Sequence, residues 1–178
     1  MEHAKQLDAE DGNNLWMKAL EKEMNELGVA VVVQDHDVRA PPGWTKISGH
    51  LTCDVKMDFS RKAQWVLGGY KMPDPLCSQF AGVVTRESVR IVFLYATLNN
   101  LDICAARIRN AYLQAPSSWK DYIICVPEFG LENVGKVALV LRAIYGGKTS
   151  GQDCWSHLRS CMHHLGFQLC PVDRDVWM

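Results

Sequence analysis

The stretch Leu101–Pro116 (LDICAARIRNAYLQAP) constrains the fold most, because it changes from apolar to polar within a few residues. Its apolar residues are mixed with small ones, a pattern typical of a strand packed on both faces. The run ends at the polar pair Arg109-Asn110, and an aromatic residue, Tyr112, follows. We therefore predict a buried strand that ends at a cleft, with the preceding residues forming a sheet behind it.

The composition fits one globular domain with a hydrophobic core. The chain has 178 residues, of which 48% are hydrophobic and 22% charged, and this length suffices for a single domain. The net charge of −1 argues against a uniformly basic surface, although a local basic groove remains compatible with it. Basic residues do gather in the ranges Lys56–Lys62 and Arg86–Arg90.

Cysteine usage and the N-terminus indicate an intracellular protein that is not secreted. The seven cysteines are odd in number and irregularly spaced, which favours reduced thiols. Acidic residues appear early in the chain, and no apolar segment typical of a secretion signal follows them. The longest apolar runs, such as Val29–Val33, are too short to cross a bilayer, so no membrane contact is expected.

Three helices are predicted, preceded by a disordered acidic tail over residues 1–12. Asn13 or Asn14 can cap a helix that ends near Leu27. Thr85 can cap a second helix from 86 to about 99. Its expected core face is Val89, Val92, Phe93 and Leu98. Thr149 or Ser150 can cap the third, which ends at His164 or Leu165.

Strands are predicted between these helices. Residues 29–34 are rich in β-branched side chains, and residues 49–69 alternate with period two on both sides of a polar turn, as in a hairpin. Short apolar strands are expected at 122–126 and 137–141, with turns at 116–121 and 145–148 and loops at 71–80 and 127–135. The fold class is therefore α+β with a mainly antiparallel sheet.

Other chemistries find little support in the motifs. Cys154, His157, Cys161 and His164 lie on one predicted helix, and one helix cannot surround a tetrahedral zinc ion. The sequence Gly147-Lys148-Thr149 ends like a phosphate-binding P-loop, but Arg142 replaces the glycine that such a loop requires. No nucleophile-elbow motif of a hydrolase is present.

Five motifs in order resemble the N-terminal part of a copia-type LTR-retrotransposon reverse transcriptase. They are Trp16-x-x-Ala19-x-x-x-Glu23, Lys62-Ala63-Gln64-Trp65-Val66, Arg86-Glu87-Ser88-Val89-Arg90, Arg107-Ile108-Arg109-Asn110-Ala111-Tyr112-Leu113 and Tyr145-Gly146-x-Lys148. The resemblance covers residues 13–178. It implies a right-hand polymerase fold, with fingers over about 13–100 and part of the palm over about 101–178.

The resemblance also implies a site and its partners. In the family, two Mg²⁺ ions support RNA-directed DNA synthesis on a primer–template with deoxynucleoside triphosphates. The residues implied to contact nucleotide or template are Lys62, Gln64, Asn110, Ala111, Tyr112, Gly146 and Lys148. The family acts inside virus-like particles in the cytoplasm, or in the nucleus, as part of a longer polyprotein.

This sequence departs from the family where catalysis requires carboxylates. Arg107 stands at the position of the first catalytic Asp, and no Y-x-D-D motif occurs before Met178. Gln64 also replaces an expected Arg. We therefore expect a truncated or degenerate copy that has no intact catalytic residue, binds no Mg²⁺ and does not polymerise. The alternative is a non-catalytic remnant of the same fold that binds nucleic acid or protein.

Overall fold

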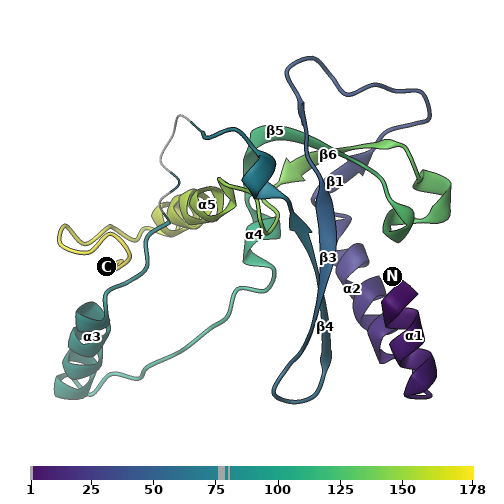
Figure 1. The fold of residues 1–178 in the computed structure, drawn as a ribbon. Helices are drawn as coiled ribbons and strands as arrows, with labels where there is room; N and C mark the ends of the chain where they lie inside the picture. Colours follow the sequence, from purple (N-terminus) through teal and green to yellow (C-terminus); the bar gives the residue numbers. More distant parts are fainter. Residues whose placement is uncertain (1, 76–78, 80) are drawn as a thin grey trace.

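The computed structural model describes residues 2–75, 79 and 81–178, and its architecture is α+β (Figure 1). The helices are α1 (Glu2–Glu10), α2 (Leu15–Leu27), α3 (Arg86–Leu98), α4 (Ala111–Gln114) and α5 (Ser150–His164). The strands are β1 (Val31–Val33), β2 (Thr45–Lys46), β3 (Gly49–Val55), β4 (Arg61–Leu67), β5 (Pro116–Ile124) and β6 (Val137–Arg142). Short 3-10 turns occupy Gly69–Lys71, Pro127–Phe129 and Leu131–Asn133.

The strands form two sheets. One has the order β1-β6-β5-β2, in which β6 pairs antiparallel with both neighbours and β2 runs parallel to β5. The other is the β3–β4 hairpin, with Asp54 opposite Lys62. Most strand pairs are thus antiparallel, in agreement with the predicted fold class.

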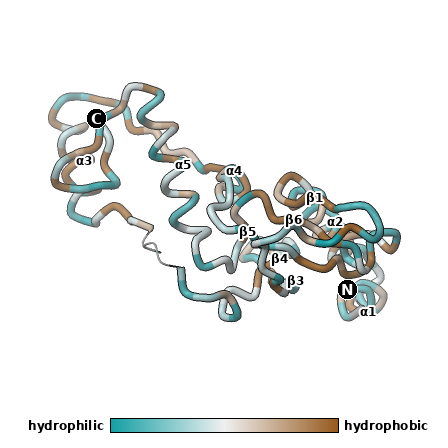
Figure 2. The backbone as a smooth tube through the Cα atoms, turned by 90° about the horizontal axis from the view of Figure 1, so that it is seen from above, coloured by the Kyte–Doolittle hydropathy of each residue, from teal (hydrophilic) through white to brown (hydrophobic). Residues whose placement is uncertain are grey.

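The main core lies between α2, the four-stranded sheet and the buried face of β4. Leu27, Trp65, Ile123 and Ile144 are among its buried members. The alternation predicted for the hairpin is confirmed on β4, where Ala63, Trp65 and Leu67 are all buried. Figure 2 shows that many residues coloured as hydrophobic lie around the sheets and α2. This core therefore fixes the hairpin and α2 relative to each other.

Most of the predicted elements are present. The predicted strand 29–34 corresponds to β1, the predicted hairpin to β3 and β4, and the predicted strands 122–126 and 137–141 to the second part of β5 and to β6. Helices α2, α3 and α5 begin and end close to their predicted bounds. Thr85 caps α3 as predicted, because its Oγ1 accepts a hydrogen bond from the Ser88 N–H at 3.1 Å. Part of the predicted loop 71–80, namely 76–78 and 80, lies outside the described residues.

The prediction of a disordered tail over residues 1–12 is wrong. Residues 2–10 form α1, and Ala4 is buried against α2 in a small cluster with Trp16 and Leu20. The polar composition concealed the apolar spacing of Ala4 and Leu7, which lie on one face of a helix. Asp8 adds a second attachment, since its carboxylate accepts hydrogen bonds from the backbone N–H groups of α2.

The buried strand predicted in the stretch Leu101–Pro116 is also wrong. Residues 101–108 are irregular and exposed, with Ile103 51% and Ile108 53% exposed. Among the described residues no strand pairs with this segment. An apolar run predicts burial only if a partner strand exists, and here none does. The polar turn at 109–110 is present, and α4 follows it directly.

Two further predictions need correction. The expected core face of α3 is exposed, and Ala96 is the buried residue of that helix. The turn predicted at 116–121 is instead the first part of β5, with an irregular register between Pro116 and Asp121. Proline is tolerated there because it is the first residue of the strand.

No helix in the described part of the chain has the length and hydropathy that a membrane crossing requires.

Candidate nucleic-acid interface

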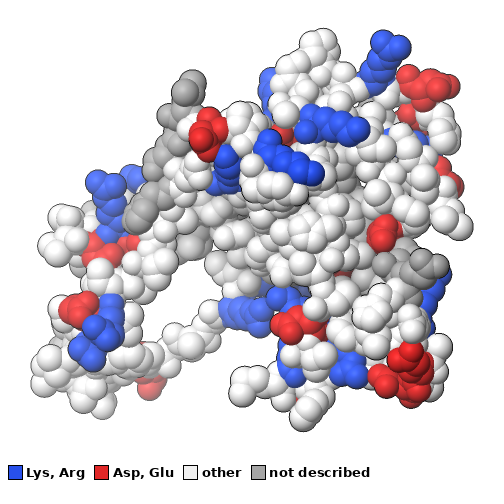
Figure 3. Space-filling view, in the orientation of Figure 1, with Lys and Arg blue, Asp and Glu red and all other residues white. Residues whose placement is uncertain are grey.

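A groove of about 490 Å³ opens where α2, the hairpin and the residues before α4 meet. Eight charged side chains line it: Lys22, Lys56, Arg61, Lys62, Arg107 and Arg109, with the acids Glu23 and Glu26. The small or amide residues Ala19, Ala63 and Asn110 complete its wall. Figure 3 shows Lys and Arg atoms gathered where the chain leaving α3 reaches the hairpin. We refer to this feature as the basic groove.

Glu23 attaches the α2 wall of the groove to the hairpin. Its Oε1 accepts a hydrogen bond from the backbone N–H of Trp65 at 2.8 Å. Burial raises the pKa of the Glu23 carboxyl above its ordinary value, although the hydrogen bond from Trp65 and the charge of Lys62 oppose the shift. This carboxylate is therefore committed to holding α2 against β4.

Glu26 attaches the third wall of the groove, the segment before α4, to α2. Its two carboxylate oxygens accept hydrogen bonds from the Arg109 guanidinium and from Asn110 Nδ2, the latter at 2.9 Å. The Arg109 contact holds the pKa of Glu26 below its ordinary value. Asn110 adopts a left-handed backbone conformation with φ of 49°, which Asn tolerates better than most residues. That conformation lets the chain turn from the groove wall into α4.

Four of the six cations in the groove form no salt bridge with an acid of the described chain. Arg109 pairs with Glu26, and Arg61 pairs with Asp11 at 3.6 Å. Within residues 2–75, 79 and 81–178, the remaining four form no salt bridge: Lys22, Lys56, Lys62 and Arg107. All four are exposed. Because six cations and two acids line it, the groove presents an excess of positive charge to solvent, as an anion-binding surface requires.

A second cluster of predicted site residues lies at the end of β4. The Tyr112 and Tyr145 rings contact each other with centroids 4.5 Å apart and planes inclined by 33°. Burial is the main cause that raises the pKa of the Tyr145 hydroxyl, and the charge of Arg107 opposes it. Both Glu23 and Arg107, which line the basic groove, act on the Tyr145 hydroxyl.

Gly146 allows the turn after β6 to approach β4 closely. Its φ of +85° lies in the left-handed region, and a Cβ there would stand 2.2 Å from the Leu67 carbonyl oxygen. The Leu67 N–H also donates to the Tyr145 carbonyl oxygen at 2.7 Å. Any larger residue at 146 would therefore push Tyr145 and its neighbours away from the hairpin.

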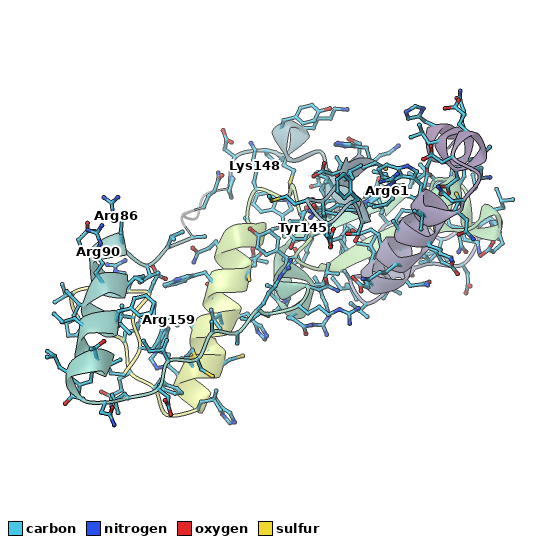
Figure 4. The ribbon with its side chains drawn as sticks, turned by 90° about the horizontal axis from the view of Figure 1, so that it is seen from below. Arg61, Arg86, Arg90, Tyr145, Lys148 and Arg159 are labelled. Atoms are coloured by element: carbon cyan, nitrogen blue, oxygen red, sulfur yellow. The ribbon has the colours of Figure 1, made fainter. Side chains whose placement is uncertain are left out.

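Lys148 lies outside the basic groove. Its Nζ donates to Asp74 Oδ1 at 2.5 Å, and this contact lowers the pKa of the Asp74 carboxyl. Figure 4 shows Lys148 and Tyr145 close to the turn, with Arg61 farther along the hairpin. The amine of Lys148 is thus paired within the protein.

The predicted site residues therefore separate into two neighbouring groups. Lys62 and Asn110 line the basic groove together with Arg107. Gln64 is half-buried on β4, two residues from Lys62, and Ala111 begins α4. Tyr112 and Gly146 belong to the tyrosine cluster, whereas Lys148 contacts Asp74.

Sequence reasoning missed the contribution of α2 to the groove. Lys22, Glu23 and Glu26 share the polar side of that helix at spacings of three and four residues, which brings their side chains together. This spacing was visible in the sequence. The attachment of the helix to Trp65 and Arg109 was not, because those partners are more than forty residues away.

The basic groove does not suit Mg²⁺. That ion requires hard oxygen ligands in near-octahedral geometry, but the two carboxylates present are held by Trp65 and Arg109. Arg107 adds a positive charge that would repel a cation. In the described residues no group of three or more His, Cys, Asp or Glu could hold a metal ion.

The chain matches no protein-family model, no curated protein and no solved structure.

Proposed function

We propose that this chain is a reverse-transcriptase-like domain of the copia retrotransposon type that binds a nucleic-acid backbone without polymerising. The supporting observation is the basic groove, in which six cations outnumber two acids and four of the cations are exposed and form no salt bridge with the described residues. Phosphate groups are the ligands that such a surface attracts most strongly, because each contact releases condensed counterions from the nucleic acid.

The motifs that resemble the family support the same proposal. Three of them contribute to one surface: the α2 motif supplies Glu23, the β4 motif supplies Lys62, and the motif before α4 supplies Arg107 and Asn110. In the proposed fold, the hairpin and α2 belong to the fingers, and the segment after residue 101 to the palm. Within this groove Arg107 replaces a metal-binding carboxylate, so the surface favours phosphate over Mg²⁺.

The test is the binding of a labelled primer–template duplex, measured by fluorescence anisotropy over a range of salt concentrations. We expect binding at low salt that weakens as salt increases. The double variant Lys62→Ala/Arg107→Ala should bind more weakly and lower the slope of log K against log salt by about 2, near one unit for each lost phosphate contact.

A matched variant separates the groove from general charge. Lys120→Ala/Arg174→Ala removes two exposed cations that do not line the groove, and it should leave the affinity and the salt slope close to those of the parent chain. Absence of binding at low salt would refute the proposal. An equal loss in both double variants would also refute it, because binding would then depend on net charge and not on the groove.

A further inference from the structure

A pocket of about 330 Å³ lies where the four-stranded sheet meets the hairpin. The residues that lead from β2 into β3 form one wall, Trp65 and Lys71 form the second, and Ile124 and Val126 at the end of β5 form the third. This volume is at the lower end of the roughly 300–1,000 Å³ that pockets for small ligands occupy. We refer to this feature as the junction pocket. It shares no residue with the basic groove.

Backbone hydrogen bonds hold the walls of the junction pocket together. The Ile47 N–H donates to a carbonyl oxygen of β5 at 2.9 Å. The Gly68 N–H donates to the Ser48 carbonyl oxygen at 2.7 Å, and the Lys71 N–H donates to the Gly68 carbonyl oxygen at 2.9 Å. Lys46 and Lys71, which are far apart in the sequence, are thereby brought to one pocket.

The inner surface of the junction pocket is apolar and contains one unpaired donor. Ile47 is 4% exposed and Trp65 is 2% exposed. The Nε1 of Trp65 is buried and has no hydrogen-bond partner among the described residues. A Cβ at Gly49 would stand 2.6 Å from this nitrogen, so the indole ring can occupy its place only because residue 49 has no side chain. A ligand oxygen at this wall would supply the acceptor that the N–H lacks.

The mouth of the junction pocket is positively charged. Lys46 and Lys71 are exposed, and neither forms a salt bridge within residues 2–75, 79 and 81–178. The Lys71 Nζ lies 5.3 Å from the centre of the Tyr70 ring, a contact that leaves its charge uncompensated. Among the described residues no acid lines the pocket, and Ser48 adds an exposed hydroxyl. The pocket thus combines an apolar interior with two cations and hydrogen-bond donors.

We propose that the junction pocket binds a small organic phosphate monoester, with its phosphate between Lys46 and Lys71 and its apolar body against the inner surface. A phosphate monoester carries nearly two negative charges at neutral pH, and two ammonium groups balance them. Its apolar body would leave water for the isoleucine and valine side chains of the pocket, a gain that inorganic phosphate cannot have. This site is separate from the basic groove, so the inference does not depend on the proposed function.

The test is a titration of the full chain with phenyl phosphate, followed by the indole N–H signals of its six tryptophans in two-dimensional NMR spectra. Trp65→Phe identifies the signal of Trp65. We expect that signal to shift to saturation with a dissociation constant on the order of 1 mM. Inorganic phosphate should bind at least about tenfold more weakly because it lacks the apolar body, and neutral benzyl alcohol should not saturate the shift.

Matched variants test the two lysines. Lys46→Ala/Lys71→Ala should weaken phenyl phosphate binding at least about tenfold and keep the spectrum of a folded chain, because both side chains are exposed. Lys120→Ala/Arg174→Ala removes two exposed cations outside the pocket and should leave the affinity unchanged. Primer–template binding should persist in Lys46→Ala/Lys71→Ala, so failure here is distinguishable from failure of the proposed function.

Three outcomes would overturn the proposal. The first is a Trp65 signal that does not shift to saturation with phenyl phosphate. The second is inorganic phosphate that binds as tightly as phenyl phosphate, because the pocket would then hold an ion by charge alone. The third is an equal loss of affinity in the two double variants, which would assign the binding to net charge and not to Lys46 and Lys71.

Discussion

Asp121 places a carboxyl group in the core of the four-stranded sheet. It is 2% exposed on β5, and its Oδ1 has no hydrogen-bond partner among the described residues. Burial raises the pKa of this carboxyl from 3.8 to about 6. The folded state therefore holds the proton more tightly than the unfolded state. As a consequence, the contribution of Asp121 to stability is fully present below pH 3.8 and is lost as the pH rises through about 6.

We predict that Asp121→Asn stabilises the protein at neutral pH. The raised pKa corresponds to about 3 kcal/mol of lost stability above pH 6, and the neutral amide avoids most of that cost. The free energy of unfolding from urea titrations should be higher in the variant at pH 7.5. Between pH 4 and 6 the variant should lack the decrease in this free energy that the Asp121 carboxyl causes in the parent chain. An unchanged pH profile in the variant would contradict the prediction.

Asp173 has a lowered pKa, so its effect on the pH dependence of the free energy of unfolding is opposite to that of Asp121. Hydrogen bonds from the Ser88 hydroxyl and from the backbone N–H groups of Asp175 and Thr85 lower its pKa from 3.8 to about 2. Its stabilising contribution is therefore present above pH 3.8 and is lost as the pH falls toward 2. Asp173→Asn should remove stability at neutral pH, whereas Asp121→Asn should add it.

Single positions in the groove were partly predictable. Lys62 and Asn110 came from short motifs, and the structure places both in the basic groove. Lys148 came from a motif as well, but its partner Asp74 is a loop residue at a distance of 74 positions. A sequence indicates which side chains can bind an anion. It does not indicate which of them the fold has already paired.

The contact between α1 and α2 shows how a remote side chain can begin a helix. Asp8 is 4% exposed, and its two carboxylate oxygens accept hydrogen bonds from the N–H groups of Trp16 and Met17, both at 2.9 Å. These N–H groups have no partner inside the helix. A negative charge at this end also interacts favourably with the helix dipole. Asp8 thus caps α2 from outside it.

We predict that Asp8→Ala lowers the free energy of unfolding by about 1–2 kcal/mol, the usual cost of losing a helix cap. Urea titration followed by far-UV circular dichroism measures this change. Glu10→Ala is the control on the same helix, because Glu10 is exposed and, among the described residues, its side chain bonds only Gln6. A cost in Glu10→Ala as large as in Asp8→Ala would show that α1 contributes through helicity and not through the cap.

Elements with local patterns were predicted more reliably than those that depend on distant partners. The hairpin follows from alternation within residues 49–67, and α3 from the cap at Thr85. The stretch Leu101–Pro116 has the composition of a buried strand, yet no strand of the described chain lies beside residues 101–108. The apolar face of α3 was correctly identified as apolar, but among the described residues most of that face is exposed.

The arrangement of the groove separates two properties that the resemblance joins, namely binding and catalysis. Binding requires exposed cations, which four residues supply. Two-metal catalysis requires carboxylates that face the substrate, and the two carboxylates of the groove instead join its walls. The same Glu residues that hold the groove together are therefore unavailable to a metal ion, so a chain of this structure can retain one property without the other.

We accordingly predict that the chain does not extend a primer on an RNA or DNA template when Mg²⁺ and deoxynucleoside triphosphates are supplied. Arg107→Asp should not restore extension, because one new carboxylate would still face Lys62 and Arg109 and would lack free acidic partners. Denaturing gels detect single added nucleotides, and an active reverse transcriptase on the same template serves as the positive control. Extended product from the parent chain would contradict the prediction. Primer–template binding by the parent chain in the same samples would show that the loss concerns catalysis, since the exposed cations of the basic groove remain in place there.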